Sequence, residues 1–314
     1  MARIEKKKDV VIVGLGWTGS IAGMELAAEG LEIVALERGG DQNTVPEFKY
    51  PNQIDELTYG VRLKNMQHPR QATVTVRRDD NEIALPYRSM GSFLPANGVG
   101  GAGTHWNGLL WRPQPEEIKL RSYVKEKWGE SIIPEGMNLM DYPVSYDELE
   151  PFFTQFDEVA GVSGKAGNLK GQIQAGGNPF EGWRSKEYPM PALGTTYDSS
   201  KFAATAKNMG LHPFPAPAGI ASTSYVNPYG MQMAPCNFCG FCERFGCYQY
   251  SKSSPQTAVL DALKRKPNFS YRTHSEVLRV ETSADGKTAT GVTYFDAIKQ
   301  EEVFQPADLV ILSS

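Results

Sequence analysis

The chain has four cysteines, and all of them lie within twelve consecutive positions. They are separated by two, two and four residues: Cys236, Cys239, Cys242 and Cys247. A short loop with this spacing can turn its sulfur atoms toward one centre. Gly240 and Gly246 lie inside the run, and we expect both to take the positive φ angles that such a tight loop requires. Because closely spaced thiolates are typical ligands of iron–sulfur clusters, the run predicts a cluster of the 3Fe-4S or 4Fe-4S type.

Two other chemistries use four cysteines. A structural zinc ion also takes four thiolates, usually as two separated pairs. The same residues could instead form two disulfide bonds. In the cysteine run typical of bacterial ferredoxins, the last gap is three residues and a proline follows the last cysteine. Here the last gap is four residues and no proline follows Cys247. The spacing alone therefore leaves zinc and disulfides open.

A second chemical pattern lies near the N-terminus. The apolar run Asp9–Val13 is typical of a buried parallel strand, and a helical stretch, Ser20–Glu29, follows it after a glycine turn. The next apolar run, Leu31–Leu36, ends on Glu37. Strand, glycine turn, helix, strand and acidic residue together form the fingerprint of a dinucleotide-binding fold.

Each residue of this fingerprint has an expected role. Gly14 permits the tight turn, Gly16 lets the backbone approach a pyrophosphate, and Gly19 permits close packing of the helix on the strand. The pyrophosphate is expected at the helix N-terminus, where N–H groups and the helix dipole favour an anion. Glu37 is expected to accept hydrogen bonds from ribose hydroxyls.

A second glycine-rich segment, residues 98–112, indicates where the rest of the nucleotide lies. It begins Gly98-Val-Gly-Gly-Ala-Gly103, and so many glycines let main chain lie flat against a planar ligand. His105, Trp106 and Asn107 then provide a nucleophile, an aromatic surface and an amide.

These motifs resemble the glucose–methanol–choline (GMC) family of FAD-dependent oxidoreductases over nearly the whole chain. The resemblance includes both glycine segments, Thr104-His105-Trp106, the stretch Val144–Phe153, the cysteine run and Ala307–Leu312. It implies that the nucleotide is FAD. The residues that it assigns to FAD are Gly14, Gly16, Gly19, Glu37, Arg38, Gly100, Gly101, Gly103, Thr104, His105, Asn107, Gly108 and Val277.

The context of His105 resembles the flavin attachment point of pyranose oxidases, a sister branch. The resemblance implies a covalent bond from this histidine to FAD, and a histidine that only hydrogen-bonds near the flavin is the alternative. Ala102 and Gly103 replace the small hydroxyl residues usual in the family, so the register around Asn107 can differ by one position.

For the complete protein, the resemblance implies oxidation of an alcohol group of a sugar acid or polyol, with hydride transfer to FAD. Electrons would then leave through the iron–sulfur cluster to a cytochrome. The alternatives are a pyranose oxidase-like flavoenzyme and an inactive flavin-binding fragment with a structural zinc site. The family's proton acceptor, a histidine paired with His or Asn, is expected beyond Ser314. We therefore expect a truncated chain that has no dehydrogenase activity by itself.

Composition and charge limit the partners. The net charge is −4, with both signs distributed along the chain, which argues against nucleic-acid binding. No apolar run reaches the length of about 18 residues that suggests a membrane span, so membrane association is expected only through a partner. The N-terminus shows no apolar signal region. The family resemblance implies a multihaem cytochrome c subunit and a small signal-bearing subunit, with co-export to the periplasm. A cytoplasmic location is the alternative.

The expected fold class is α/β, a Rossmann-like FAD-binding domain with an inserted, partly irregular substrate lobe and a cysteine-rich loop. Residues 1–112 form the first part of the FAD-binding domain, with the flavin loop at 96–112, and residues 113–215 form the substrate lobe. Residues 216–255 form the cysteine-rich loop, and 256–314 form the second part of the FAD-binding domain. Helices are expected at Asp147–Glu158 and Gln256–Lys266.

Overall fold

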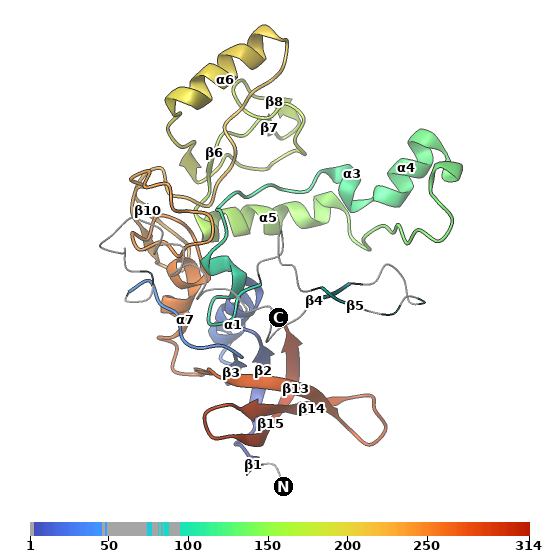
Figure 1. Ribbon diagram of the computed structural model, residues 1–314, viewed down its shortest axis with the longest axis vertical. Coiled ribbons are helices and arrows are strands. Elements are labelled where there is room, and N and C mark those ends of the chain that lie inside the picture. The colour runs from blue at the N-terminus through green and yellow to red at the C-terminus, as the bar shows by residue number, and fades with distance from the viewer. Residues whose placement is uncertain are drawn as a thin grey trace. The chain divides into compact units, whose positions relative to one another are not determined.

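The computed structural model describes residues 3–45, 48, 74–76, 81, 83, 85–87 and 95–314. The chain divides into two compact units (Figure 1). The first comprises Met1–Thr73, Arg88–Gly108 and Val226–Ser314, and the second comprises Val74–Tyr87 and Leu109–Tyr225. Each unit is described separately below.

The first unit is built on a sheet whose strands run in the order β12-β3-β2-β15-β14-β13. Its four parallel strands are β2 (Lys8–Val13), β3 (Ile33–Leu36), β12 (Phe269–Arg272) and β15 (Glu301–Leu312). Their Val, Ile and Leu residues suit strands that are covered on both faces. All four residues of β3 are buried, as expected for a strand covered on both faces.

Helix α1 (Trp17–Ala28) connects β2 to β3 and packs on the sheet (Figure 1). A side chain on Gly23 would meet Leu263 at 3.1 Å and Ile12 at 3.4 Å, so small residues let the helix approach closely. The helix begins three residues earlier than expected from the sequence, and β3 begins two residues later. Because Gly16 is the N-cap, the helix starts inside the glycine turn.

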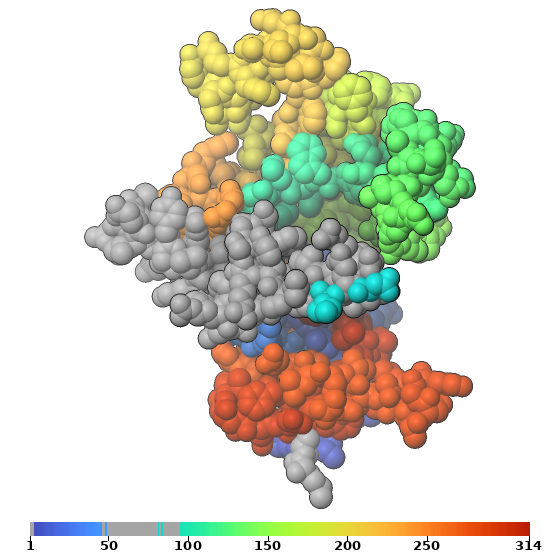
Figure 2. All heavy atoms as spheres, turned by 45° about the vertical axis from the view of Figure 1, so that its right-hand side comes forward, coloured from blue at the N-terminus to red at the C-terminus, as the bar shows by residue number. Residues whose placement is uncertain are grey.

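An antiparallel meander completes the sheet. Strand β13 (Ser275–Thr282) pairs with β14 (Ala289–Asp296), which pairs with β15, and the short β1 (Arg3–Ile4) pairs with β15. Figure 2 shows strands β13 to β15 as the continuous orange and red surface of this unit. The buried core joins the meander to the parallel strands through Val11, Val34, Leu36, Val292, Tyr294, Val303 and Ala307.

The helix expected from Gln256 onward forms, but its first turn is wider than an α-helix. Residues Gln256–Leu260 are a π-helical turn (η3), followed by α7 (Asp261–Leu263). Wide turns of this kind are frequent at functional sites. Three short elements complete this part of the chain: the 3₁₀ turn η1 (Gly101–Thr104), β10 (Tyr225–Val226) and β11 (Gln232–Met233).

The second unit contains α5 (Tyr146–Ala160) and short elements around it. Ser145 caps α5, since its Oγ accepts from the Glu148 N–H while the Glu148 carboxylate accepts from the Ser145 N–H. The expected helix at Asp147–Glu158 therefore forms, with one extra residue before it and two after. The other elements are β4 (Val74–Val76), β5 (Leu85–Tyr87), α3 (Pro115–Ile118), α4 (Leu120–Trp128), η2 (Glu130–Ile132), β6 (Ser163–Gly164), β7 (Asn168–Leu169), β8 (Gln172–Ile173), β9 (Met190–Pro191) and α6 (Tyr197–Asn208).

The fold class expected from the sequence is present, with the parallel strands, the helix after the glycine turn and the returning meander. The unit that contains the expected substrate lobe, residues 113–215, extends from Leu109 to Tyr225 and also includes Val74–Tyr87. Among the described residues, no helix has the length and apolar character needed to cross a membrane.

Candidate functional site

A cavity of about 430 Å³ opens in the first unit at the carboxyl ends of the parallel strands. In open α/β sheets this edge is where ligands bind. Its walls come from the glycine turn, the end of β3, the flavin loop, the start of β13 and the residues after β15. The lining residues are Val13, Gly14, Leu15, Gly16, Leu36, Glu37, Arg38, Pro95, Ala96, Gly98, Gly101, Ala102, Ser275, Glu276, Val277, Ser313 and Ser314.

The three glycines of the first turn have different surroundings. Gly14 has a φ of 89°, a conformation that favours glycine. A Cβ on Gly19 would lie 2.2 Å from the carbonyl oxygen of Gly14, so this glycine lets the helix contact the turn. A Cβ on Gly16 would meet only the Gly100 oxygen, at 4.0 Å, so no close contact within the described part of the chain requires a glycine there. Gly16 lines the cavity, where an added side chain would exclude a ligand.

Glu37 lies at the end of β3 with only 7 % of its surface exposed. One carboxylate oxygen accepts from the Leu15 N–H at 3.1 Å, and the other accepts from the Gly39 N–H at 2.9 Å. The two bonds fix the carboxylate between the glycine turn and the strand end. A carboxylate has about four acceptor positions, so two remain for hydroxyls of a bound ribose.

The flavin loop approaches the cavity through positive-φ glycines. Gly100 has a φ of 95° and Gly101 has a φ of 55°. A Cβ on Gly100 would lie 2.3 Å from Nε2 of Gln256, and a Cβ on Gly103 would lie 2.6 Å from Nε1 of Trp17. The loop is therefore packed tightly on both the helix and the η3 turn.

His105 follows η1 and is only 5 % exposed. Its Nε2 atom is buried and has no hydrogen-bond partner among the residues that the structure describes. Burial lowers the pKa of His105, so the imidazole is neutral at neutral pH. Oε1 of Gln256 is also buried without a partner within the described part of the chain. Buried polar atoms normally have a partner, so both atoms fit a site that holds a polar cofactor.

Only some of the residues that the sequence assigns to FAD line the cavity. Gly14, Gly16, Glu37, Arg38, Gly101 and Val277 line it. The same segments carry other predicted residues that are not part of the lining: Gly19, Gly100, Gly103, Thr104 and His105. Of the two that remain, Gly108 is buried and Asn107 is exposed.

The cysteine loop lies between β11 and η3, and its four partly buried cysteines are free thiols. Two disulfides are thus not formed. Phe238, Gly240 and Arg244 have positive φ angles of 55°, 81° and 68°, so the backbone turns sharply as expected. The prediction for Gly246 was wrong: it has no positive φ, and its Cβ would instead lie 2.2 Å from the Phe48 ring. Position 246 therefore needs a glycine because that ring approaches closely, and not because of the backbone angle.

No group of three or more His, Cys, Asp or Glu side chains is placed to hold a metal ion in the described residues. The structure therefore does not show the cluster site, although all four cysteines share one short loop. Burial raises the pKa of Cys236 and of Cys242, which favours the thiol form in the absence of a cation.

Two residues near the flavin loop were not expected from the sequence. Lys252 is buried, and its ammonium donates to the carbonyl oxygen of Trp106 at 2.5 Å. Gln256 donates to the carbonyl oxygen of Val99 at 2.8 Å. Both lie in the run Ser251–Thr257, which is polar except at Pro255 and buried throughout, and the sequence gives no sign of this burial. Such a run normally indicates a surface loop.

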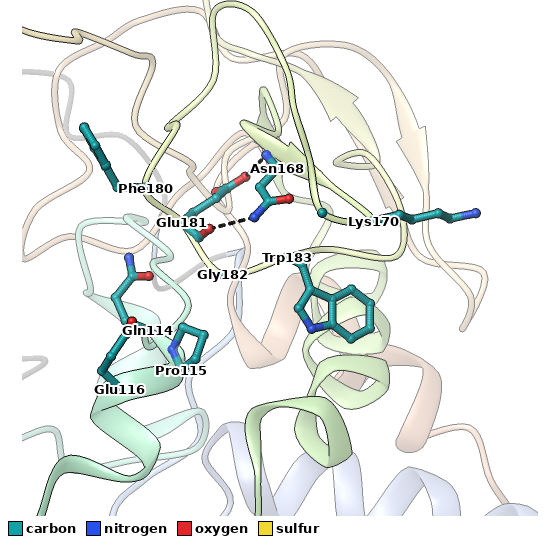
Figure 3. Close-up of a pocket in the computed structure, with 10 residues that line it drawn as sticks. Gln114, Pro115, Glu116, Asn168, Lys170, Phe180, Glu181, Gly182 and Trp183 are labelled. Carbon is teal, nitrogen blue, oxygen red and sulfur yellow. Dashed lines mark hydrogen bonds between the residues drawn. The ribbon is translucent and has the colours of Figure 1, made fainter. Parts of the chain in front are cut away.

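The second unit has its own pocket of about 610 Å³, shown in Figure 3. Its lining residues are Gln114, Pro115, Glu116, Asn168, Lys170, Gly171, Phe180, Glu181, Gly182 and Trp183. The Glu181 carboxylate accepts from the Gly167 N–H at 2.6 Å and from the Asn168 N–H at 3.2 Å. This carboxylate therefore holds its own loop in place.

Beneath this pocket, α5 presents buried carboxylates to two arginines. Arg112 donates to Glu150 at 3.1 Å and also to Asp157, and Arg184 donates to Asp157 as well. The guanidinium of Arg184 lies 3.7 Å from the centre of the Tyr188 ring. This network links the helix to the loops that follow it.

Comparison with known proteins agrees with this geometry. The chain is 48 % identical over 312 residues to a gluconate 2-dehydrogenase flavoprotein of Pantoea cypripedii, covering 98 % of this chain and 51 % of that protein. It is 26 % identical over 224 residues to the fructose dehydrogenase large subunit of Gluconobacter japonicus, covering 69 % of this chain and 37 % of that protein. The chain thus spans about half the length, or less, of the curated relatives it matches.

A solved structure of formate oxidase has the same fold. It matches 99 % of this chain and 46 % of its own, with a TM-score of 0.52 and 18 % sequence identity. No family model matches the sequence.

Proposed function

The chain belongs to the glucose–methanol–choline family of FAD-dependent oxidoreductases, and we propose that it binds FAD in the cavity of its first unit. The observation that carries this proposal is the cavity at the carboxyl ends of β2, β3 and β15, bounded by Gly16, Glu37 and the flavin loop. When bound, FAD supplies an acceptor for a hydride from an alcohol carbon.

The chain's own residues would bind and orient the cofactor. The N-terminus of α1 faces the cavity through Gly16, where helix N–H groups favour a pyrophosphate. Glu37 is held by two backbone N–H groups with acceptor capacity left for ribose hydroxyls. Val277 lies on the opposite wall, at the start of β13, and would meet the adenine.

We further propose that His105 forms a covalent bond to the flavin. Its buried, neutral Nε2, which has no hydrogen-bond partner among the described residues, is the observation that favours this. The test is denaturing electrophoresis of the complete protein and of a His105→Ala variant. Flavin fluorescence should migrate with the band of the wild-type protein and be absent from the band of the variant. Fluorescence lost equally from both bands would show a non-covalent flavin.

The substrate class proposed for the complete protein is a sugar acid or polyol. Support comes from the two relatives, whose names refer to gluconate and fructose as substrates. The complete protein should reduce an artificial dye with gluconate or a related polyol under anaerobic conditions. If oxygen but no dye accepts the electrons, the pyranose oxidase-like alternative, suggested by Thr104-His105-Trp106, is correct instead.

The proposed electron exit is an iron–sulfur cluster on Cys236, Cys239, Cys242 and Cys247. The shared loop, the absence of disulfides between these cysteines and the left-handed residues Phe238 and Arg244 support it, because such backbone persists only where the surroundings enforce it. Analysis of iron and acid-labile sulfide in anaerobically purified protein tests it. Stoichiometric zinc without sulfide would identify a structural zinc site instead.

We also propose that the complete protein works with a multihaem cytochrome c subunit and is carried to the periplasm by a small signal-bearing subunit. One relative is named as the large subunit of an assembly, which supports a multi-subunit enzyme. Co-purification from a periplasmic fraction tests this proposal. A flavoprotein found alone in the cytoplasm would contradict it.

A further inference from the structure

Lys252 is the charged residue whose position demands an explanation in the first unit. It is only 1 % exposed. Its ammonium donates to three carbonyl oxygens: Trp106 at 2.5 Å, Phe245 at 2.6 Å and Cys242 at 2.7 Å. An ammonium has three N–H donors, so these carbonyls use its full capacity.

The position is costly for a lysine. No carboxylate forms an ion pair with Lys252 within the described residues. A buried cation without an anionic partner is rare because the desolvation cost is several kcal/mol. A residue retained at such a cost is a candidate for function.

The three carbonyls belong to two different loops. Trp106 follows the candidate flavin-bonding residue His105, whereas Cys242 and Phe245 belong to the cysteine loop. Further bonds join the same segments. The His105 carbonyl accepts from the Arg244 N–H at 2.7 Å, and the Lys252 N–H donates to Sγ of Cys247 at 3.4 Å. The indole N–H of Trp106 donates to the Ser253 carbonyl at 2.7 Å.

We propose that Lys252 is a positioning residue that couples the cysteine loop to the flavin loop. Its ammonium holds the peptide after His105 against the carbonyls of Cys242 and Phe245, so a change at the cysteines moves the residues beside the flavin. This inference rests on the proposed function in one respect, that flavin is bound next to His105.

The positive charge of Lys252, like its hydrogen bonds, affects both loops. The ammonium interacts electrostatically with Cys239, Cys242 and Cys247 on one side and with His105 on the other. A fixed positive charge at this place stabilises negative charge on either loop. We therefore expect the flavin's reduction midpoint potential to become more negative when Lys252 is replaced by a neutral residue.

A double-mutant cycle in the complete flavoprotein tests the coupling. One arm is Lys252→Met, and the other is the double substitution Cys236→Ser and Cys239→Ser, which leaves the carbonyls that contact Lys252 in place. The readout is the midpoint potential of the bound flavin, which loss of stability alone does not shift while the protein stays folded. Lys287→Met, at an exposed lysine of the same unit, is the matched control and should leave the potential unchanged.

Coupling through Lys252 predicts non-additive results. The cysteine substitutions should shift the potential when Lys252 is present and leave it unchanged in the Lys252→Met background. Equal shifts in both backgrounds, or no shift in either, would overturn the proposal. Wild-type protein that holds no flavin would instead contradict the proposed function.

A second variant covers the case in which Lys252→Met does not fold. Lys252→Gln keeps two N–H donors but removes the charge. Hydrogen exchange of the Arg244 amide, which donates to His105, then reports the contact between the loops. Faster exchange in Lys252→Gln than in Lys287→Met supports the coupling, and equal exchange overturns it.

Discussion

Gly16 and Gly19 lie three positions apart in one turn, but the structure gives each a different reason to be glycine. The absent side chain of Gly19 leaves space for the Gly14 carbonyl oxygen, which a Cβ would approach to 2.2 Å. A Cβ on Gly16 would meet, among the described residues, only the Gly100 oxygen at 4.0 Å, and Gly16 lines the cavity. Gly19 is therefore needed for the packing of the helix against the turn, whereas Gly16 leaves space for a ligand.

We predict opposite phenotypes for the two alanine variants. Gly19→Ala should lower the free energy of unfolding by about 1–3 kcal/mol, because the added methyl group overpacks the helix against the turn. Gly16→Ala should unfold like the wild type but bind FAD at least about tenfold more weakly, a loss of about 1.4 kcal/mol. Urea unfolding and flavin titration measure the two effects. A Gly16→Ala protein with unchanged FAD affinity would show that the pyrophosphate does not contact this wall.

The Glu37 carboxylate carries the next residue-scale prediction. Both of its oxygens accept backbone N–H groups, whereas the amide of Glu37→Gln would turn a donor toward one of them. An unsatisfied buried group costs about 1–3 kcal/mol, so we expect the flavin-free variant to lose that much unfolding free energy and to bind FAD more weakly. Glu29→Gln, at an exposed position on the same helix–strand connection, is the control. Equal stability of the two variants would contradict the assigned bonds.

Residue roles could be predicted from the sequence only where they depend on local spacing. Gly14, Gly16 and Glu37 occupy positions fixed by one strand–turn–helix–strand unit, so their places in the cavity follow from the pattern. Lys252 could not be predicted, because its burial depends on loops that are far apart in the sequence.

At the scale of elements, α5 shows how a helix is held by charge inside the second unit. The pKa of Glu150 would rise through burial alone. Hydrogen bonds from the Ser185 N–H, from Thr154 and from Arg112 outweigh that effect and hold this pKa below its ordinary value. A carboxylate whose pKa is lower in the folded state than in the unfolded state stabilises the fold. This stabilisation is fully present at a pH above the unfolded-state pKa, and it is lost as the pH falls through the folded-state pKa.

We therefore predict an acid-sensitive contribution from Glu150. Stability of the wild type should fall as the pH drops below the unfolded-state pKa of about 4.3, and Glu150→Gln should lose less stability over the same range. At neutral pH the variant should be less stable by about 1.5–3 kcal/mol, since it loses hydrogen bonds to a charged group. Urea unfolding at several pH values, with exposed Glu126→Gln as the control, measures this. Identical pH dependence in wild type and Glu150→Gln would contradict it.

The boundaries of elements show where sequence patterns reach their limit. The helices α5 and η3–α7 form where the sequence predicts them, and α5 begins at a capping box on Ser145. The wide π turn at Gln256–Leu260 was not expected; its first residue, Gln256, donates to the Val99 carbonyl oxygen of the flavin loop, a contact between segments that are far apart in the sequence. In the same way, the Phe48 ring explains Gly246 better than a turn rule does.

At the scale of the whole molecule, the strand order places the predicted motifs on one edge of the sheet. The turn after β2, the end of β3 and the end of β15 meet there because these strands are parallel and adjacent. Strands β2 and β15 are almost 300 positions apart, and no pattern in the sequence predicted their pairing. The alternation of strands and helices predicted the fold class, but the register between distant strands is a tertiary property.

The measurement that tests the central claim most directly is the FAD content of the purified chain, set beside that of Gly16→Ala. The account predicts one FAD for each wild-type chain, and a Gly16→Ala protein that is equally folded but contains little flavin. A folded wild-type chain that takes up no FAD, or a Gly16→Ala chain that holds as much as the wild type, would contradict it.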